Sequence, residues 1–161
     1  MASGEVSLTE MENLVLSDSF LSFVNTLMAS LDLEHGRFLK LEAAWIISIV
    51  SNISEESSLS ILSGPLRPLF EDLLKSNDLL VLEFAVMIVG NLAVEGAEFK
   101  HVLLQELSIV PRLFEINQHI CRMDTSLPRT IVESVLWAIE HLTKNAKIFS
   151  GREEEVGSLV Q

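Results

Sequence analysis

The chain has 161 residues, which corresponds to about one domain and leaves room for a sizeable buried core. Its 11 Lys and Arg residues against 23 Asp and Glu residues give a formal net charge of −12, and such a surface repels phosphate backbones and anionic lipid. We therefore expect neither a nucleic-acid nor a membrane partner. The hydrophobic fraction of 48% excludes a wholly disordered chain. The single cysteine, Cys121, excludes an intrachain disulfide and favours an intracellular protein.

The beginning of the chain does not have the composition of a targeting segment, because residues 1–15 contain acids and no Lys or Arg. We expect residues 1–17 to be a flexible N-terminus or a partial first helix. The charge-free stretches Ala43–Ser54 and Phe84–Val94 are far shorter than the roughly 20 apolar residues that a membrane span needs. No transmembrane helix is predicted.

Three long apolar segments have the spacing of helices. In Arg37–Ile53, apolar residues recur at steps of three and four around Trp45, and further apolar side chains widen that face. The same character returns in Leu79–Val94 and in Arg129–Asn145. Apolar and polar residues do not alternate, and Asn-Gly and Asp-Gly hairpin turns are absent. The sequence therefore predicts long helices that must be covered on most sides, and no β-sheet.

Shorter amphipathic segments precede each long one, so that the order short, medium, long recurs along the chain. Pro65, Pro68 and Pro111 stand where helices can begin, because a first-turn proline loses no internal hydrogen bond. We expect shorter helices over Phe20–Ser30, Ser57–Ser63, Leu66–Ser76, Phe99–Leu107 and Ile109–Gln118.

The long segments are spaced like the units of a helical repeat. Aligning their centres pairs Trp45, Met87 and Trp137, at intervals of 42 (87 − 45) and 50 (137 − 87) residues. A period near 42 is typical of armadillo or HEAT repeats, and the longer second interval indicates an insertion within Ile120–Leu127. We therefore predict an all-α fold, a right-handed superhelical solenoid of about three armadillo-type repeats over residues 18–147. An acidic flexible tail is expected over residues 148–161.

Two of the long segments also carry a recognisable local pattern. Leu41-Glu42-Ala43-Ala44-Trp45 and the run EFAVMIVGNLA at 83–93 resemble the armadillo repeats of the importin alpha family, whose helices read approximately EAAWALTNIA and EQAVWALGNIA. The similarity continues into residues 95–100 and 109–113, and it covers the chain from about Phe20 to Asn145.

This resemblance implies a peptide-binding groove. In the family, the third helix of each repeat lines a concave groove, where a Trp and an Asn four residues apart hold an extended basic peptide. Residues i and i+4 share a helix face, so the indole can hold the stem and ammonium group of Lys while the carboxamide pairs with the peptide backbone. The resemblance thus implies a protein or peptide partner of basic character, no cofactor, a role in nuclear import, and cytoplasmic and nuclear localisation.

The chain keeps these Trp and Asn pairs only in part. Ile49 follows Trp45 at the fourth residue, and His141 follows Trp137, whereas Asn91 follows a methionine. The missing groups would remove roughly 2 to 4 kcal/mol, so we expect reduced affinity for nuclear localisation peptides. The peptide-binding residues implied by the resemblance are Trp45, Ser58, Met87, Asn91, Glu95, Trp137 and His141.

Some of these residues have a simpler alternative role. Trp45 and Trp137 lie on strongly apolar segments, so each can belong to the core instead of the groove. Asn91 would be costly if buried without partners, which favours either the groove or a hydrogen bond between repeats. Glu95 and Ser58 stand where the family has an acid and a hydroxyl that form a lysine pocket, but Glu95 can also be a solvated surface acid.

A second hypothesis is a structural module whose groove binds no peptide. No following repeat is expected to cover the last long helix, which could then mediate homodimerisation or docking. The contact face predicted for that role consists of Ile131, Val135, Ile139 and Leu142.

No catalytic or metal-binding pattern is present in the sequence. The four histidines are scattered, and His119 with Cys121 would supply at most two metal ligands. Glycine-rich phosphate loops and G-x-S-x-G motifs are absent as well. We therefore expect that the protein is not an enzyme and holds neither a metal nor a cofactor.

Overall fold

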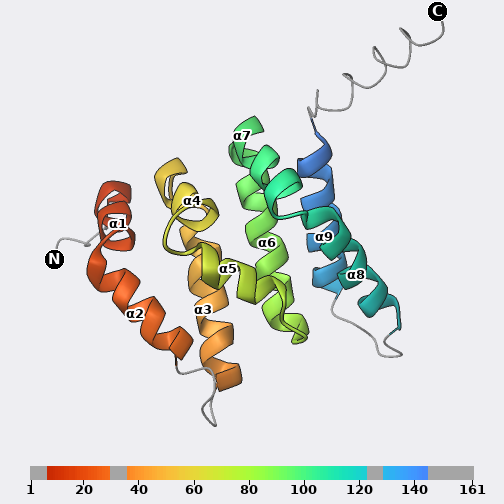
Figure 1. Ribbon diagram of the computed structural model, residues 1–161, viewed down its shortest axis with the longest axis horizontal. Helices are drawn as coiled ribbons and strands as arrows, with labels where there is room; N and C mark the ends of the chain where they lie inside the picture. The colour runs from red at the N-terminus through yellow and green to blue at the C-terminus, as the bar shows by residue number, and fades with distance from the viewer. Residues whose placement is uncertain (1–6, 30–35, 123–128, 145–161) are drawn as a thin grey trace, which may run out of the picture.

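The computed structural model describes residues 7–29, 36–122 and 129–144, and these residues form helices joined by short turns, with no strand among them (Figure 1). The all-α prediction is confirmed for this part of the chain. In order, the helices are α1 (Leu8–Val15), α2 (Asp18–Ala29), α3 (Gly36–Val50), α4 (Glu55–Leu62), α5 (Arg67–Leu74), α6 (Leu79–Glu95), α7 (Ala97–His101), the π-helical η1 (Val102–Glu106), α8 (Ile109–Arg122) and α9 (Arg129–Thr143).

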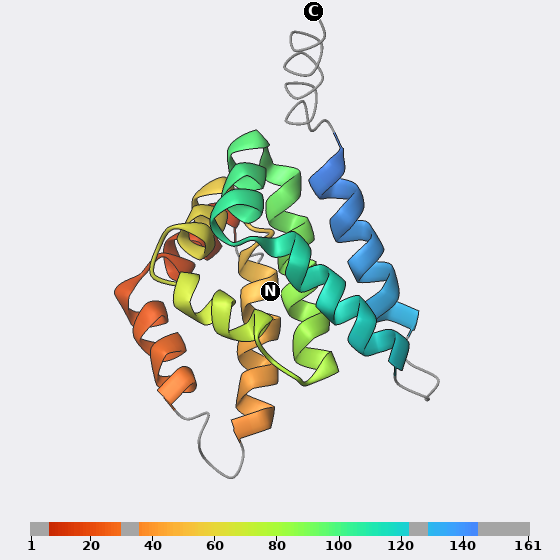
Figure 2. The ribbon, with the colours of Figure 1, turned by 45° about the vertical axis from the view of Figure 1, so that its right-hand side comes forward.

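The three long helices lie side by side in one layer. α3, α6 and α9 run in the same direction with α6 in the middle, and the shorter helices α4, α5 and α8 pass on one side of them (Figures 1 and 2). α6 contacts both α3 and α9, and α5 contacts α3 and α6. The opposite side of the long helices is not covered by this second layer.

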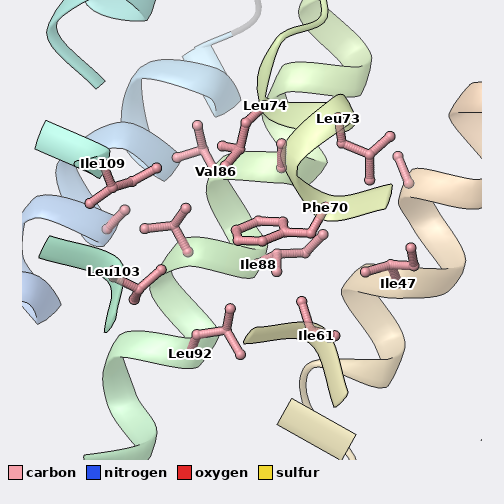
Figure 3. Packing of buried hydrophobic residues seen from close by; sticks show 14 of the residues in the cluster. Ile47, Ile61, Phe70, Leu73, Leu74, Val86, Ile88, Leu92, Leu103 and Ile109 are labelled. Atoms are coloured by element: carbon pink, nitrogen blue, oxygen red, sulfur yellow. The ribbon is translucent and has the colours of Figure 1, made fainter. Parts of the chain in front are cut away.

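The core fills the space between the two layers. Figure 3 shows Phe70 of α5 among Ile47 of α3 and Ile88 of α6, and all three side chains are fully buried. α6 is apolar on nearly all sides, and α3, α5 and α9 pack against it. Many of its residues are therefore buried. No helix of the described residues combines the length and apolar character needed to cross a membrane.

The N-terminal region contains a complete short helix. Ser7 caps α1, because the backbone N–H of Glu10 donates to Ser7 Oγ at 3.2 Å while Ser7 N–H donates to Glu10 Oε2 at 2.8 Å. The hydrogen bond from the Ser7 backbone holds the pKa of the Glu10 carboxyl below its usual value. Residues 1–17 were predicted to be either a flexible N-terminus or a partial first helix, and residues 8–15 form a helix.

α8 extends beyond its predicted end at Gln118, so the first part of the insertion predicted within 120–127 belongs to this helix. Ile109, Leu113, Ile116 and Ile120 are buried at helical spacing, which carries the apolar face past the predicted end. The rest of the insertion, at 123–128, and the tail predicted at 148–161 lie outside the described residues.

Candidate functional site

The uncovered side of the long helices contains a shallow groove of about 600 Å³ between α6 and α9. Its walls carry carboxylates, hydroxyls, a carboxamide, a thioether and an indole. The lining residues are Glu83, Met87 and Asn91 from α6, and Thr130, Glu133, Ser134 and Trp137 from α9. The structure thus brings three of the predicted residues, Met87, Asn91 and Trp137, into one groove.

The indole of Trp137 is seated against α6 at Gly90. A Cβ atom built on Gly90 would lie only 2.0 Å from Cζ3 and 2.3 Å from Cε3 of Trp137, closer than any side-chain contact allows. Gly90 is buried, whereas Trp137 is half-buried. The absence of a side chain at Gly90 therefore lets the indole sit partly in the seam between α6 and α9 and partly in the groove.

His141 packs against the same indole. The ring centroids of His141 and Trp137 are 4.7 Å apart with the rings tilted by 52°, and His141 Nδ1 lies 2.8 Å from the carbonyl oxygen of Trp137. Because a carbonyl oxygen only accepts, the hydrogen bond requires the hydrogen on Nδ1, which makes Nε2 the acceptor in the neutral ring. His141 can therefore replace only the accepting half of a carboxamide.

Asn91 joins α6 to the end of α3. Its Nδ2 donates to Ser51 Oγ at 2.8 Å and approaches the carbonyl oxygen of Ser48 at 3.4 Å. The predicted alternative of a hydrogen bond between neighbouring units is therefore present. Because Asn91 also lines the groove, its carboxamide oxygen, which makes no hydrogen bond within the described residues, is the part available to a ligand.

Ser58 and Glu95 meet beside this joint. Ser58 Oγ lies 3.3 Å from the carbonyl oxygen of Ser51 and 3.5 Å from Glu95 Oε1, so the hydroxyl links α4 to the ends of α3 and α6. Ser58 is fully buried, whereas Glu95 is exposed. Glu95 can therefore contact a ligand directly, and Ser58 can act on a ligand only by positioning that carboxylate.

Trp45 is placed differently from Trp137. It lies on the uncovered side of α3 and is 49% exposed, and Ile49 one turn later is 41% exposed. This exposure excludes the core alternative for Trp45. The α6–α9 groove does not include Trp45, so the structure does not gather all the predicted residues at one point.

The contact face predicted on α9 is not one exposed surface, because Ile131, Val135 and Leu142 are buried and Ile139 alone of the four is exposed. The reason is that α9 packs on both α6 and α8, which cover the face taken to be free. Val135, Ile139 and Leu142 nevertheless line an apolar groove between α8 and α9.

The exposed apolar residues of the last two helices border the same α8–α9 groove. Val110 and Phe114 of α8 and Leu136 and Ile139 of α9 are exposed, and they line a largely apolar groove of about 330 Å³ between these helices.

The uncovered side of α3, α6 and α9, called the open side from here on, carries negative charge. The charge comes from Glu83 and Glu133 in the groove and from Glu95 beside it. Several bases of the described residues already pair with acids, and the Arg37 guanidinium holds the pKa of Asp78 below its usual value through a hydrogen bond. These pairs are Arg37 with Asp78, Lys40 with Asp72, Arg67 with Glu71 and Glu106, and Arg112 with Glu115.

Sequence reasoning missed five contributors to the site, four of which line the groove. Glu83 lies four residues before Met87, and Thr130, Glu133 and Ser134 lie seven, four and three residues before Trp137, so helical spacing could have found all four. Gly90 carried no such signal, because its role depends on the neighbouring helix. Across 7–29, 36–122 and 129–144, no cluster of His, Cys, Asp and Glu is placed to hold a metal ion.

These features define an all-helical protein with a shallow, acidic groove along parallel helices. The chain is similar to importin subunit alpha-2 of Arabidopsis thaliana, with 28% identity over 81 residues that cover 50% of this chain. The matched region spans only 15% of that relative's length. No family model and no solved structure matches the chain. The similarity supports a relationship of armadillo type at most.

Proposed function

We propose that the protein is a non-enzymatic adaptor of armadillo type, a short right-handed solenoid that binds extended basic peptide segments along the open side of α3, α6 and α9. The repeated order of shorter helices followed by a long parallel helix supports the solenoid part of the proposal. In this reading, the protein works in the cytoplasm and the nucleus, and its ligands resemble nuclear localisation signals.

The observation that carries the proposal is the convergence of Ser58, Asn91 and Glu95 on the junction of α3, α4 and α6. Residues separated by up to 37 positions in sequence come together there, with the Glu95 carboxylate exposed. An exposed carboxylate beside a carboxamide oxygen can take the ammonium group of a lysine, while the nearby Trp137 indole offers a face to the aliphatic stem of another basic residue.

The affinity is expected to be low. Asn91 already donates its amide N–H groups to Ser51 and Ser48, and the neutral ring of His141 offers only an acceptor to a ligand. Each backbone hydrogen bond that the ligand cannot make removes about 1 kcal/mol, or roughly fivefold in affinity.

The test is a titration of a fluorescein-labelled lysine-rich peptide with the full chain, followed by fluorescence anisotropy at low and moderate salt. We expect saturable, salt-sensitive binding that Glu95→Gln weakens by about twofold to fivefold, since an exposed ion pair contributes about 0.5–1 kcal/mol. Glu115→Gln removes the same charge from α8 and is the matched control, which should leave the affinity unchanged. Equal affinities for the two variants would contradict the proposal.

A second candidate function rests on the apolar groove between α8 and α9. The protein would then be a structural module whose open side binds no peptide. Two copies would associate through exposed side chains such as Phe114 and Leu136. Light scattering over a range of concentrations should show a dimer that Leu136→Glu converts to a monomer. A wild-type monomer at the highest concentration would exclude this candidate.

A further inference from the structure

The open side of α3 presents large apolar side chains. Phe38 is 62% exposed, Trp45 49% and Ile49 41%, and steps of seven and four residues place all three on one face of the helix. Leu80 is also exposed at the start of α6, which the Arg37–Asp78 ion pair joins to the start of α3. We call Phe38, Trp45 and Ile49 the α3 stripe.

The α3 stripe is a feature of the uncovered side of the molecule. α3 contacts α2 and α6 at its flanks and α4 and α5 behind it, and its buried residues face those neighbours. Single exposed apolar residues are ordinary on a protein surface, but three large ones aligned along one helix are typical of an interaction surface.

The half of the open side formed by α6 and α9 has a different chemistry. Its groove is lined by the carboxylates of Glu83 and Glu133 and by the polar groups of Asn91 and Ser134, with Glu95 nearby. On α3, by contrast, the acidic residue is Glu42 alone, one turn after Phe38. The open side thus carries carboxylates among apolar side chains such as Met87 and Trp137 along α6 and α9, whereas along α3 it carries three large apolar side chains and a single acid.

We propose that this side binds a two-part segment of a partner protein, in which a basic stretch lies along α6 and α9 and apolar or aromatic side chains lie on the α3 stripe. The inference rests on the proposed function and specifies its ligand. The charge of the carboxylates selects the basic part. Ile49 can neither donate nor accept a hydrogen bond, so the ligand gains affinity at α3 by burying apolar surface.

Two copies of this chain are the less suitable occupant. Each copy carries a formal charge of −12, and joining two open sides would bring their carboxylates together. A basic partner segment removes that repulsion, because its charge complements Glu83 and Glu95.

The experiment compares two labelled peptides of equal length and equal positive charge, one with serines and one with leucine and phenylalanine beside its basic stretch. We expect the second peptide to bind at least tenfold more tightly. Ile49→Asn should remove most of that advantage without weakening the serine peptide, because the new carboxamide can pair with a peptide backbone. Leu59→Asn makes the same exchange at an exposed position of α4 and is the matched control.

A spectroscopic measurement locates the apolar part of the ligand. The chain has two tryptophans and no tyrosine, so in Trp137→Phe the fluorescence comes from Trp45. The apolar-containing peptide should shift the Trp45 emission to shorter wavelength, and the serine peptide should not.

The outcomes separate the inference from the proposed function. If both peptides bind with equal, Glu95-dependent affinity, the two-part ligand is wrong and the proposed function stands. If neither binds, the proposed function itself fails. If Ile49→Asn abolishes a dimer seen by light scattering, the occupant is a second copy, and the inference is overturned.

Discussion

The two seams beside α6 hold the long helices together by different means. Toward α3, polar contacts add to the apolar packing, with Asn91 donating to Ser51 and Arg37 paired with Asp78. Toward α9, the seam depends on shape, because the Trp137 indole rests against a position without a side chain. Directional polar contacts thus contribute to the α3–α6 seam, whereas the α6–α9 seam depends on close packing of a ring against the backbone.

Two of the residues that hold these seams also line the candidate groove. Asn91 and Trp137 face the groove, yet each also holds α6 against a neighbour. Any substitution at these two residues therefore changes stability together with ligand contact. Binding measurements on such variants need a parallel measurement of the free energy of unfolding, whereas the exposed Glu95 and Ile49 can be tested with less structural effect.

The largest effect is expected in the shape-dependent seam. Alanine normally stabilises a helix interior by about 1 kcal/mol relative to glycine. Gly90→Ala should instead lower the free energy of unfolding by about 1–3 kcal/mol, because the new methyl group overlaps the Trp137 ring. Urea unfolding followed by circular dichroism measures the change.

The Trp137→Ala background is the control for this prediction. With the indole removed, Gly90→Ala should cost less than in the wild type, by a coupling energy above about 0.5 kcal/mol. Gly96→Ala adds a methyl group with no atom within 4 Å apart from its chain neighbours, so any cost there comes from the loss of a glycine at a helix end and not from overlap. Stabilisation by Gly90→Ala in the wild-type chain would show that the indole moves away freely.

A smaller effect is expected at the ion pair of the α3–α6 seam. Asp78 also caps α6, because Leu80 N–H donates to its Oδ1 at 3.1 Å, so Asp78→Ala should cost about 1 kcal/mol. Arg37 lowers the pKa of Asp78 in the folded chain, so the unfolded chain binds the proton at higher pH. The charge-dependent stabilisation is therefore complete above the unfolded pKa of about 4 and is lost as pH falls through the lower folded value.

Asp78→Asn separates charge from capping. Asparagine is a good N-cap, so this variant should keep most of the capping effect and lose the pH-dependent part. Denaturation between about pH 2 and pH 7 should show wild type and Asp78→Asn converging at the acid end. A constant difference across that range would rule out a contribution from the ion pair.

The smallest effect concerns the hydrogen bond from Asn91 to Ser51. A double-mutant cycle with Asn91→Ala and Ser51→Ala should give a coupling energy of about 0.5–1 kcal/mol. Asn117→Ala, at an exposed position of α8, is the control for loss of an asparagine and should leave stability nearly unchanged. Additive effects of the two seam substitutions would mean that the bond is replaced by water at no cost.

Sequence reasoning succeeded where apolar patterning was wide and failed where the outcome depended on a neighbouring element. The long helices were found because their apolar faces extend over several turns. The prediction did not decide whether residues 8–15 form a helix, although Ser7 and Glu10 have the spacing of a capping box. The contact face predicted on α9 is mostly buried, because that helix is apolar on more than one side.

The candidate site was predictable only as a set of positions. Helical spacing correctly placed Met87 and Asn91 on one face of α6, and alignment of the long segments related them to Trp137. The spacing could not show that Ser58 is buried or that Asn91 uses its N–H groups within the fold. Both outcomes depend on residues that are distant in sequence and that tertiary packing brings close. Ser51, for example, lies beside Asn91 although the two are 40 positions apart.

By itself, the sequence determined the helical class, the order of the helices and the acidic charge, because periodicity and composition are local properties of the chain. Only the tertiary structure decided which face of each apolar helix is covered. It placed Trp45 on the surface, Ile131 in the core and Trp137 between the two. The physical reason is that burial belongs to a contact between two elements, and an apolar residue is buried only where another helix approaches it closely.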